Sequence, residues 1–125
     1  MAINTTITTK LSKKQRSFLN IAAKTAHASE LNQRHGAVIV KSGRVLAIGL
    51  NKKRNYDLVT TSKVNNGDFT VHAEIDALSR VSNPEGATIF IARVNVNGVE
   101  MLSRPCDRCA QALADARVKN IIYTV

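Results

Sequence analysis

Apolar positions along the chain form short groups whose spacing predicts alternating helices and strands. Residues 12–29 carry apolar side chains at i, i+3 and i+4 spacing behind Ser12, a favoured N-cap residue, which predicts an amphipathic helix. Residues 36–40 and 45–50 are β-branched-rich runs joined by a turn that contains Gly43, the pattern of a hairpin. Because both runs are apolar at successive positions, we expect helices on both faces of their sheet.

The alternation continues after a long polar stretch. Residues 51–70 form a loop longer than the roughly 12–15 residues that compact domains leave unstructured, and such loops are often functional. Then follow a helix, a strand, a helix and a last strand: residues 73–80, residues 88–94, the segment opened by Pro105, and residues 118–125. The order α, β, β, α, β, α, β predicts one α/β domain over residues 1–125, with a mixed sheet between helices.

Composition supports a folded chain away from membranes. Hydrophobic residues make up 44% and charged residues 22%, the balance of a soluble globule. No apolar run approaches the roughly 20 residues that cross a bilayer, and residues 1–10 lack the pattern of a secretory signal. We therefore expect a cytoplasmic protein without membrane contact.

The charge balance is unusual for so short a chain. Eighteen Lys and Arg against nine Asp and Glu leave a net charge of +9, which attracts anions such as nucleotides, phosphates and nucleic acid. The basic residues are scattered, however, and three Phe, two Tyr and no Trp supply few stacking platforms for single-stranded nucleic acid. Charge alone does not choose between a small substrate and a polymer.

Two cysteines and a histidine have the spacing of a metal site. Cys106 and Cys109 lie three positions apart at a predicted helix start, so both sulfurs can reach one ion at about 2.3 Å. A nitrogen of His72, at the start of another predicted helix, can supply a third bond at about 2.0–2.1 Å. Three protein ligands to Zn²⁺ leave a position open for water, and Glu74, two residues from His72, suits a carboxylate that moves protons.

Two alternative interpretations, neither of them a catalytic zinc site, use the same cysteines. A structural zinc site would need a fourth protein ligand, which His27 or His35 could supply, but it would leave Glu74 without a role. A thioredoxin-like redox pair would also use Cys-x-x-Cys, although it has no need of a partnered His-x-Glu.

Together, His72-Ala73-Glu74 and Pro105-Cys106-Asp107-Arg108-Cys109 match the H-x-E…P-C-x-x-C signature of zinc nucleobase deaminases. The chain resembles the cytidine and deoxycytidylate deaminase-like superfamily from its first helix to its last strand. The resemblance implies a three-layer α/β/α cytidine deaminase-like fold, Zn²⁺ held by His72, Cys106 and Cys109, and Glu74 as the catalytic proton shuttle. Water activated on the metal would attack C4 of cytosine or C6 of adenine, and ammonia would leave.

The same resemblance assigns residues to the substrate. It implies contacts from Asn51, the Ala73 backbone N–H and the Ser103 carbonyl; without it, Asn51 is equally well a turn residue. Three basic residues of the loop are candidates for a 5′-phosphate, with a solvated loop face as the alternative: Lys52, Lys53 and Arg54. The match is closer to nucleotide deaminases than to free-cytidine enzymes, which usually have Cys at the position of His72, although residues 95–102 lengthen the connection to Pro105.

We therefore expect a zinc-dependent hydrolytic deaminase that converts cytosine to uracil in a (deoxy)cytidine nucleotide or nucleoside, with dCMP favoured. The alternative is a polynucleotide deaminase acting on tRNA adenosine or single-stranded cytosine, for which nucleic acid is the partner. A non-catalytic, zinc-stabilised nucleic-acid-binding module is a third hypothesis. The resemblance also implies a homo-oligomer.

Overall fold

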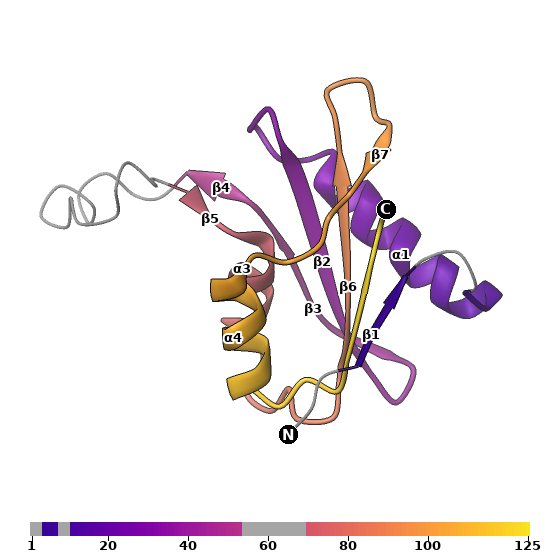
Figure 1. Cartoon of the computed structure of the whole chain (residues 1–125), viewed down its shortest axis with the longest axis vertical. Helices are drawn as coiled ribbons and strands as arrows, with labels where there is room; N and C mark the ends of the chain where they lie inside the picture. The colour runs from indigo at the N-terminus through magenta and orange to yellow at the C-terminus, as the bar shows by residue number, and fades with distance from the viewer. Residues whose placement is uncertain (1–3, 8–10, 54–69) are drawn as a thin grey trace, which may run out of the picture.

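The computed structural model describes residues 4–7, 11–53 and 70–125, which build one main β-sheet flanked by helices (Figure 1). Five strands follow one another across the sheet in this order: β1 (Asn4–Ile7), β8 (Asn120–Tyr123), β6 (Thr88–Val94), β2 (Arg34–Lys41) and β3 (Arg44–Leu50). A short sixth strand, β7 (Glu100–Met101), pairs with the end of β6. β8 pairs in parallel with β1 and β6, whereas β2 pairs antiparallel with β6 and β3. The sheet is mixed, as predicted.

Three described helices cover the two faces of this sheet. α1 (Lys13–Ala26) lies on one face, and α3 (Ala73–Leu78) and α4 (Asp107–Asp115) lie on the other (Figure 1). Side chains that alternate along the strands form a core beneath each layer, as Val38 and Phe90 do beneath α1, and Ile39 and Ile91 do beneath α3 and α4. The predicted three-layer α/β/α architecture is confirmed. No described helix is long and apolar enough to span a membrane.

The helix boundaries differ from the predicted ones at their ends. Ser12 caps α1 as predicted: its hydroxyl accepts from the Gln15 N–H, and the Gln15 side chain accepts from the Ser12 N–H, a capping box. α1 ends at Ala26 rather than at residue 29. α4 begins at Asp107 rather than at Pro105, because Cys106 has extended backbone angles and is itself the N-cap.

Strand β1 was not predicted. Its four residues are polar except for Ile7, so they carry no alternation that distinguishes them from coil. What makes them a strand is pairing with β8, residue by residue from Asn4 beside Asn120 to Ile7 beside Tyr123. The strand depends on a partner more than 100 positions away in the sequence, and local pattern cannot report such a partner.

The hairpin of β2 and β3 forms as predicted, but its exposure does not match the prediction. Ser42 and Gly43 both have positive φ, 52° and 76°, the requirement of a tight type I′ turn. We expected β3 to be covered on both faces, yet Val45, Leu46 and Ile48 are 41%, 38% and 41% exposed. β3 is an edge strand, and α1 packs mainly over β2 and β6, so part of its surface is left uncovered.

A glycine near the end of β3 allows α3 to pack closely on the sheet. A Cβ atom at Gly49 would collide with backbone atoms of Ala73 and Ala77, so only glycine permits this approach. The close contact places the start of α3 beside the end of β3.

A second, two-stranded ribbon follows β3 at the boundary of the predicted loop. β4 (Lys52–Lys53) and β5 (Thr70–Val71) pair antiparallel. Residues 54–69, the rest of that loop, lie outside the described residues.

Candidate active site

Three metal-ligating side chains meet where α3 and α4 begin. His72 is the N-cap of α3, Cys106 is the N-cap of α4, and Cys109 lies in the first turn of α4. The His72 Nδ1 atom is 3.3 Å from Cys109 Sγ and 3.7 Å from Cys106 Sγ. One ligand atom from each residue lies within 4.8 Å of the other two. The fold thus brings together residues separated by 34 positions in the sequence.

The three donors fit a zinc ion. Bonds of about 2.3 Å from sulfur and 2.0–2.1 Å from nitrogen, in tetrahedral geometry, separate ligand atoms by roughly 3.5–3.8 Å. The two nitrogen–sulfur distances here fall at or just below that range. Two thiol sulfurs with one imidazole also form the mixed soft donor set that zinc accepts. Among the described residues, this cluster contains three ligands, which is the number found in catalytic sites with an open position.

The cluster opens into a pocket of about 360 Å³, within the size range of small-molecule sites. Its walls come from the segment before β2, from the end of β3, from the start of α3 and from the segment before α4. Nine residues line it: Leu31, Gln33, His35, Asn51, His72, Ala73, Glu74, Arg104 and Cys106. Of the predicted site residues, the structure therefore places His72, Cys106, Glu74, Asn51 and Ala73 around one space.

Glu74 is a buried carboxyl group in the wall of this pocket. It is only 4% exposed, and burial raises the pKa of its carboxyl group, against the opposing effects of its own backbone N–H, the charge of His72 and a hydrogen bond from Cys109. Burial, the Glu74 charge and Cys106 likewise raise the pKa of the Cys109 thiol. Because of its raised pKa, the buried Glu74 carboxylate holds a proton more readily than a solvated carboxylate does.

Neither of the two histidines considered as a fourth zinc ligand belongs to the cluster found among the described residues. His27 is the C-cap of α1 and sits against Gly98, in the turn after β6. His35 lines the pocket, but it is not part of the metal-ligand cluster of the described residues. Burial first, and then the charges of Arg93 and His72, lower the pKa of His35 to about 4, so its imidazole is neutral at pH 7.

Asn51 combines a place in the pocket wall with a structural role. Its side-chain oxygen accepts from the His35 N–H at 2.8 Å, and its side-chain nitrogen donates to the Gln33 carbonyl at 2.6 Å. It is 8% exposed. Asn51 thus ties the end of β3 to the start of β2 and to the residue just before it.

The three candidate phosphate residues have different positions. The Lys52 ammonium forms an ion pair with Asp76 at 3.0 Å. Lys53 is exposed on β4, and neither lysine lines the pocket. Arg54 lies outside the described residues.

Asp76 is a buried acidic residue that sequence reasoning missed. Its carboxylate accepts from the Leu50 N–H at 3.2 Å and pairs with Lys52 at 3.0 Å and Arg80 at 3.3 Å. Burial alone would raise its pKa, but the bonds from Lys52 and the Leu50 N–H, with the charges of Lys52 and Arg80, lower it below its ordinary value. The i, i+4 spacing to Arg80 was a readable signal, whereas the contact with Leu50 was not.

Ser103 is held in a buried polar network rather than in the pocket wall. Its hydroxyl donates to the Ile91 carbonyl at 2.8 Å and accepts from the Thr124 N–H at 2.9 Å, while its N–H donates to the Thr124 carbonyl. These bonds fix the backbone just before Arg104, which lines the pocket.

Comparison with known proteins agrees with this geometry. The sequence profile of the cytidine and deoxycytidylate deaminase zinc-binding region matches residues 12–125. Among curated protein sequences, none matches this chain significantly.

Solved structures show the same fold. The dCMP deaminase of cyanophage S-TIM5, in its apo form, is 21% identical with a TM-score of 0.67, covering 93% of this chain and all of its own. Its complex with dCMP and dUMP is also 21% identical, with a TM-score of 0.63 over 93% of this chain and 86% of its own. A cytidine deaminase from Mycobacterium tuberculosis is 21% identical, with a TM-score of 0.56 over 90% of this chain and 85% of its own.

The family profile spans both half-motifs, and the structure brings the ligands of those motifs to zinc-binding distances beside a buried glutamate in a pocket. The chain therefore belongs to the cytidine and deoxycytidylate deaminase family, and it is a zinc-dependent deaminase.

Proposed function

We propose that this enzyme hydrolyses the amino group of cytosine in a (deoxy)cytidine nucleotide or nucleoside, with dCMP as the favoured substrate. The observation that carries the proposal is Glu74, buried in the wall of a pocket that also holds the His72, Cys106 and Cys109 cluster. The fold shared with a dCMP deaminase solved with dCMP and dUMP adds support for the substrate.

The protein groups account for the proton movements of this reaction. Zinc, when bound by His72, Cys106 and Cys109, supplies the Lewis acidity that makes water a nucleophile near neutral pH. Glu74 would take one proton from the water that attacks C4 and pass it to the ring nitrogen, and would then take the second proton from the resulting C4 hydroxyl and pass it to the departing amino group. Cytosine and water become uracil and ammonia, and the carboxylate is regenerated. The raised pKa of Glu74 suits a group that must both take and return a proton.

Pocket residues orient the base in this proposal. Asn51 and Ala73 line the pocket, and the Asn51 amide and the Ala73 N–H would contact the sugar or base. The Ser103 carbonyl, in the segment before α4, would be a third contact from outside the pocket lining. Asn51 is already fixed by its bonds to Gln33 and His35, so its place in the pocket wall would not change when substrate binds.

Other expectations stay predictions. A cytoplasmic location and a homo-oligomer are consistent with the family. A polymer substrate, either tRNA adenosine or single-stranded cytosine, is the alternative that the substrate assay below decides.

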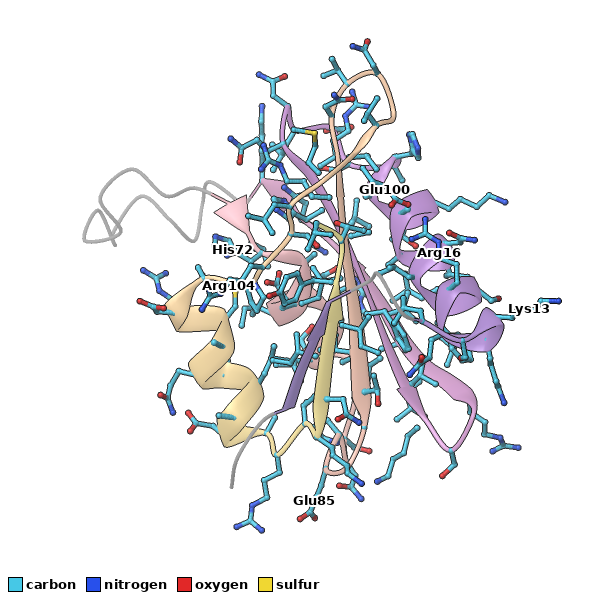
Figure 2. All side chains as sticks on the ribbon, turned by 45° about the vertical axis from the view of Figure 1, so that its right-hand side comes forward. Lys13, Arg16, His72, Glu85, Glu100 and Arg104 are labelled. Carbon is cyan, nitrogen blue, oxygen red and sulfur yellow. The ribbon has the colours of Figure 1, made fainter. Side chains whose placement is uncertain are left out.

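A Glu74→Gln variant tests the mechanism. Glutamine keeps the size of the side chain but cannot shuttle a proton, so we expect one zinc ion per chain and turnover of dCMP reduced by about 10²–10⁴. Zinc content by elemental analysis and ammonia release measure the two effects. Glu85→Gln, a surface carboxyl paired with Arg117 at the far end of the molecule (Figure 2), is the matched control. Loss of zinc from Glu74→Gln would make Glu74 a ligand or a structural support instead.

A panel of substrates tests the reaction itself. We expect the wild-type enzyme to deaminate dCMP with a higher kcat/KM than dCTP, cytidine, deoxycytidine, a cytosine oligonucleotide or tRNA. Faster reaction on a polymer would replace the proposal with the polynucleotide alternative. Absence of turnover on every compound would refute it.

A further inference from the structure

We propose that Arg104 binds the 5′-phosphate of the substrate and gives the enzyme its preference for a nucleoside monophosphate. This inference rests on the proposed function and assigns the anion-binding group of the same site. It replaces the loop lysines that the sequence suggested for this task.

The charges of the pocket lining single out Arg104. Among the nine lining residues it is the only lysine or arginine. The neighbouring His35 is uncharged at pH 7, because burial and the charge of Arg93 hold its pKa at about 4. Glu74, also in the lining, is a buried acid and supplies no positive charge. The fixed positive charge on the pocket wall of the described residues is therefore the Arg104 guanidinium.

Arg104 is also available for a ligand. Its side chain is exposed, and no carboxylate of the described residues forms an ion pair with it. Asp115, an acidic residue of α4, accepts from the side chain of Gln111 at 2.9 Å. An exposed guanidinium on a pocket wall can form two parallel hydrogen bonds to a phosphate, which gives both energy and direction.

The loop lysines are less suitable. The charge of Lys52 is committed to the buried Asp76 at 3.0 Å, and its release would leave that carboxylate with less compensation. Lys53 is exposed on β4 and does not reach the pocket lining. Both contribute to the attraction of anions over distance, but neither is placed to hold one in the site.

The backbone on both sides of Arg104 is fixed. Ser103 is 2% exposed and bonded to Ile91 and Thr124, and Pro105 and Cys106 follow directly. Figure 2 shows Arg104 beside His72 at the start of α4, and both residues line the pocket. The same segment thus presents a metal ligand toward the base and a cation toward the outer part of the substrate.

Arg104→Gln and Arg104→Lys test the proposal on the zinc-loaded enzyme. We expect kcat/KM for dCMP to fall about 10- to 100-fold in Arg104→Gln, mainly through KM, because a hydrogen-bonded charge pair is lost. Lysine keeps the positive charge but cannot form the two parallel hydrogen bonds of a guanidinium group, so Arg104→Lys should give an intermediate kcat/KM for dCMP. For deoxycytidine, which has no phosphate, the change should be several times smaller. Zinc per chain should stay at one.

A matched control and a binding measurement accompany the kinetics. Arg44→Gln removes the same charge at the start of β3, about 20 Å along the strand from its end at the pocket, and should leave the ratio of dCMP to deoxycytidine unchanged. Calorimetric binding of dUMP, the product, should weaken about 10-fold or more in Arg104→Gln and not in Arg44→Gln.

The outcomes separate this inference from the proposed function. Equal losses for dCMP and deoxycytidine, unchanged dUMP binding, or a larger dependence on Arg104 for dCTP than for dCMP would each overturn the Arg104 assignment while deamination stands. Wild-type enzyme that deaminates neither compound would refute the proposed function, and dUMP binding would then decide alone whether Arg104 binds a nucleotide phosphate.

Discussion

The N-terminus of α1 and the N-termini of α3 and α4 use their capping positions for opposite purposes. Ser12 closes a capping box on α1, a 14-residue helix that packs along one face of the sheet. On the other face the N-cap positions are His72 and Cys106, and neither side chain makes a capping hydrogen bond. The first helix uses its cap for stability, while the other two use theirs for metal ligands.

This difference shows how the site is built. An N-cap residue is extended and stands at the edge of the helix, so its side chain can face a neighbouring helix start. The N-cap positions of α3 and α4 bring the His72 Nδ1 and Cys106 Sγ atoms to 3.7 Å from each other. The cost is an uncapped α3 of only six residues, too short to be stable alone.

Tertiary contacts compensate for the missing cap of α3. Gly49 allows the helix backbone to lie directly on β3, and Asp76 joins the helix to the Leu50 N–H and to Lys52. The active-site helix is therefore held by its neighbours, whereas α1 is also supported by its own end.

Replacing His72, the N-cap residue of α3, should have the largest effect, because it exchanges a metal ligand for a residue that caps the helix. His72→Ser removes a ligand but supplies a good N-cap, so we expect loss of stoichiometric zinc and a fall in dCMP turnover on the order of a thousandfold or more. In the zinc-free state, His72→Ser should unfold with about 0.5–1 kcal/mol more stability than His72→Ala, which lacks the cap. Elemental analysis, ammonia release and urea unfolding measure these effects.

Two results would contradict this view. Stoichiometric zinc in either variant would reject His72 as a ligand. Equal stability of the Ser and Ala variants would show that the start of α3 gains nothing from a capping side chain.

Removing the charge of Asp76 tests the tertiary support. Asp76→Asn keeps an acceptor for the Leu50 N–H but loses the pairing with Lys52 and Arg80, so we expect a loss of about 1–3 kcal/mol in the free energy of unfolding at pH 7. Urea unfolding of the zinc-free protein gives the value.

The pH dependence of that loss follows from the pKa direction. The pKa of Asp76 is lowered in the folded state, so its contribution is complete above its ordinary pKa of 3.8 and is lost as the pH falls through the folded value. The gap between wild type and Asp76→Asn should therefore stay constant from pH 5 to 8 and shrink below about pH 4. A gap that widened in acid would reverse the assignment.

The smallest effect belongs to the cap of α1. Ser12→Ala should cost about 1 kcal/mol and lower Tm by about 3–6 °C, with zinc content and kcat/KM for dCMP unchanged. Calorimetry and ammonia release are sufficient. A loss of activity in this variant would mean that the two faces of the sheet are coupled and that the cap of α1 also serves the active site.

Local pattern sufficed for much of the fold. The apolar stripe behind Ser12, the β-branched runs around Gly43 and the half-motifs at His72 and Cys106 each depend on neighbours within a few positions, so sequence predicted them. Strand β1 could not be predicted in this way because it forms by pairing with the distant strand β8. The exposure of β3 could not be predicted because an edge strand can have the same apolar sequence as a central strand.

Within the site, the sequence by itself indicated which three residues could bind a metal ion and which family the chemistry resembles, because ligand type and spacing are local properties. Only the tertiary structure decided which cations face the pocket. In the sequence, Lys52 and Arg104 are both basic residues near a predicted site motif. In the structure, Lys52 forms an ion pair with the buried Asp76, whereas Arg104, in the fixed segment before Cys106, lines the pocket. The difference lies in long-range packing, which places one charge beside a buried carboxylate and the other beside an open space.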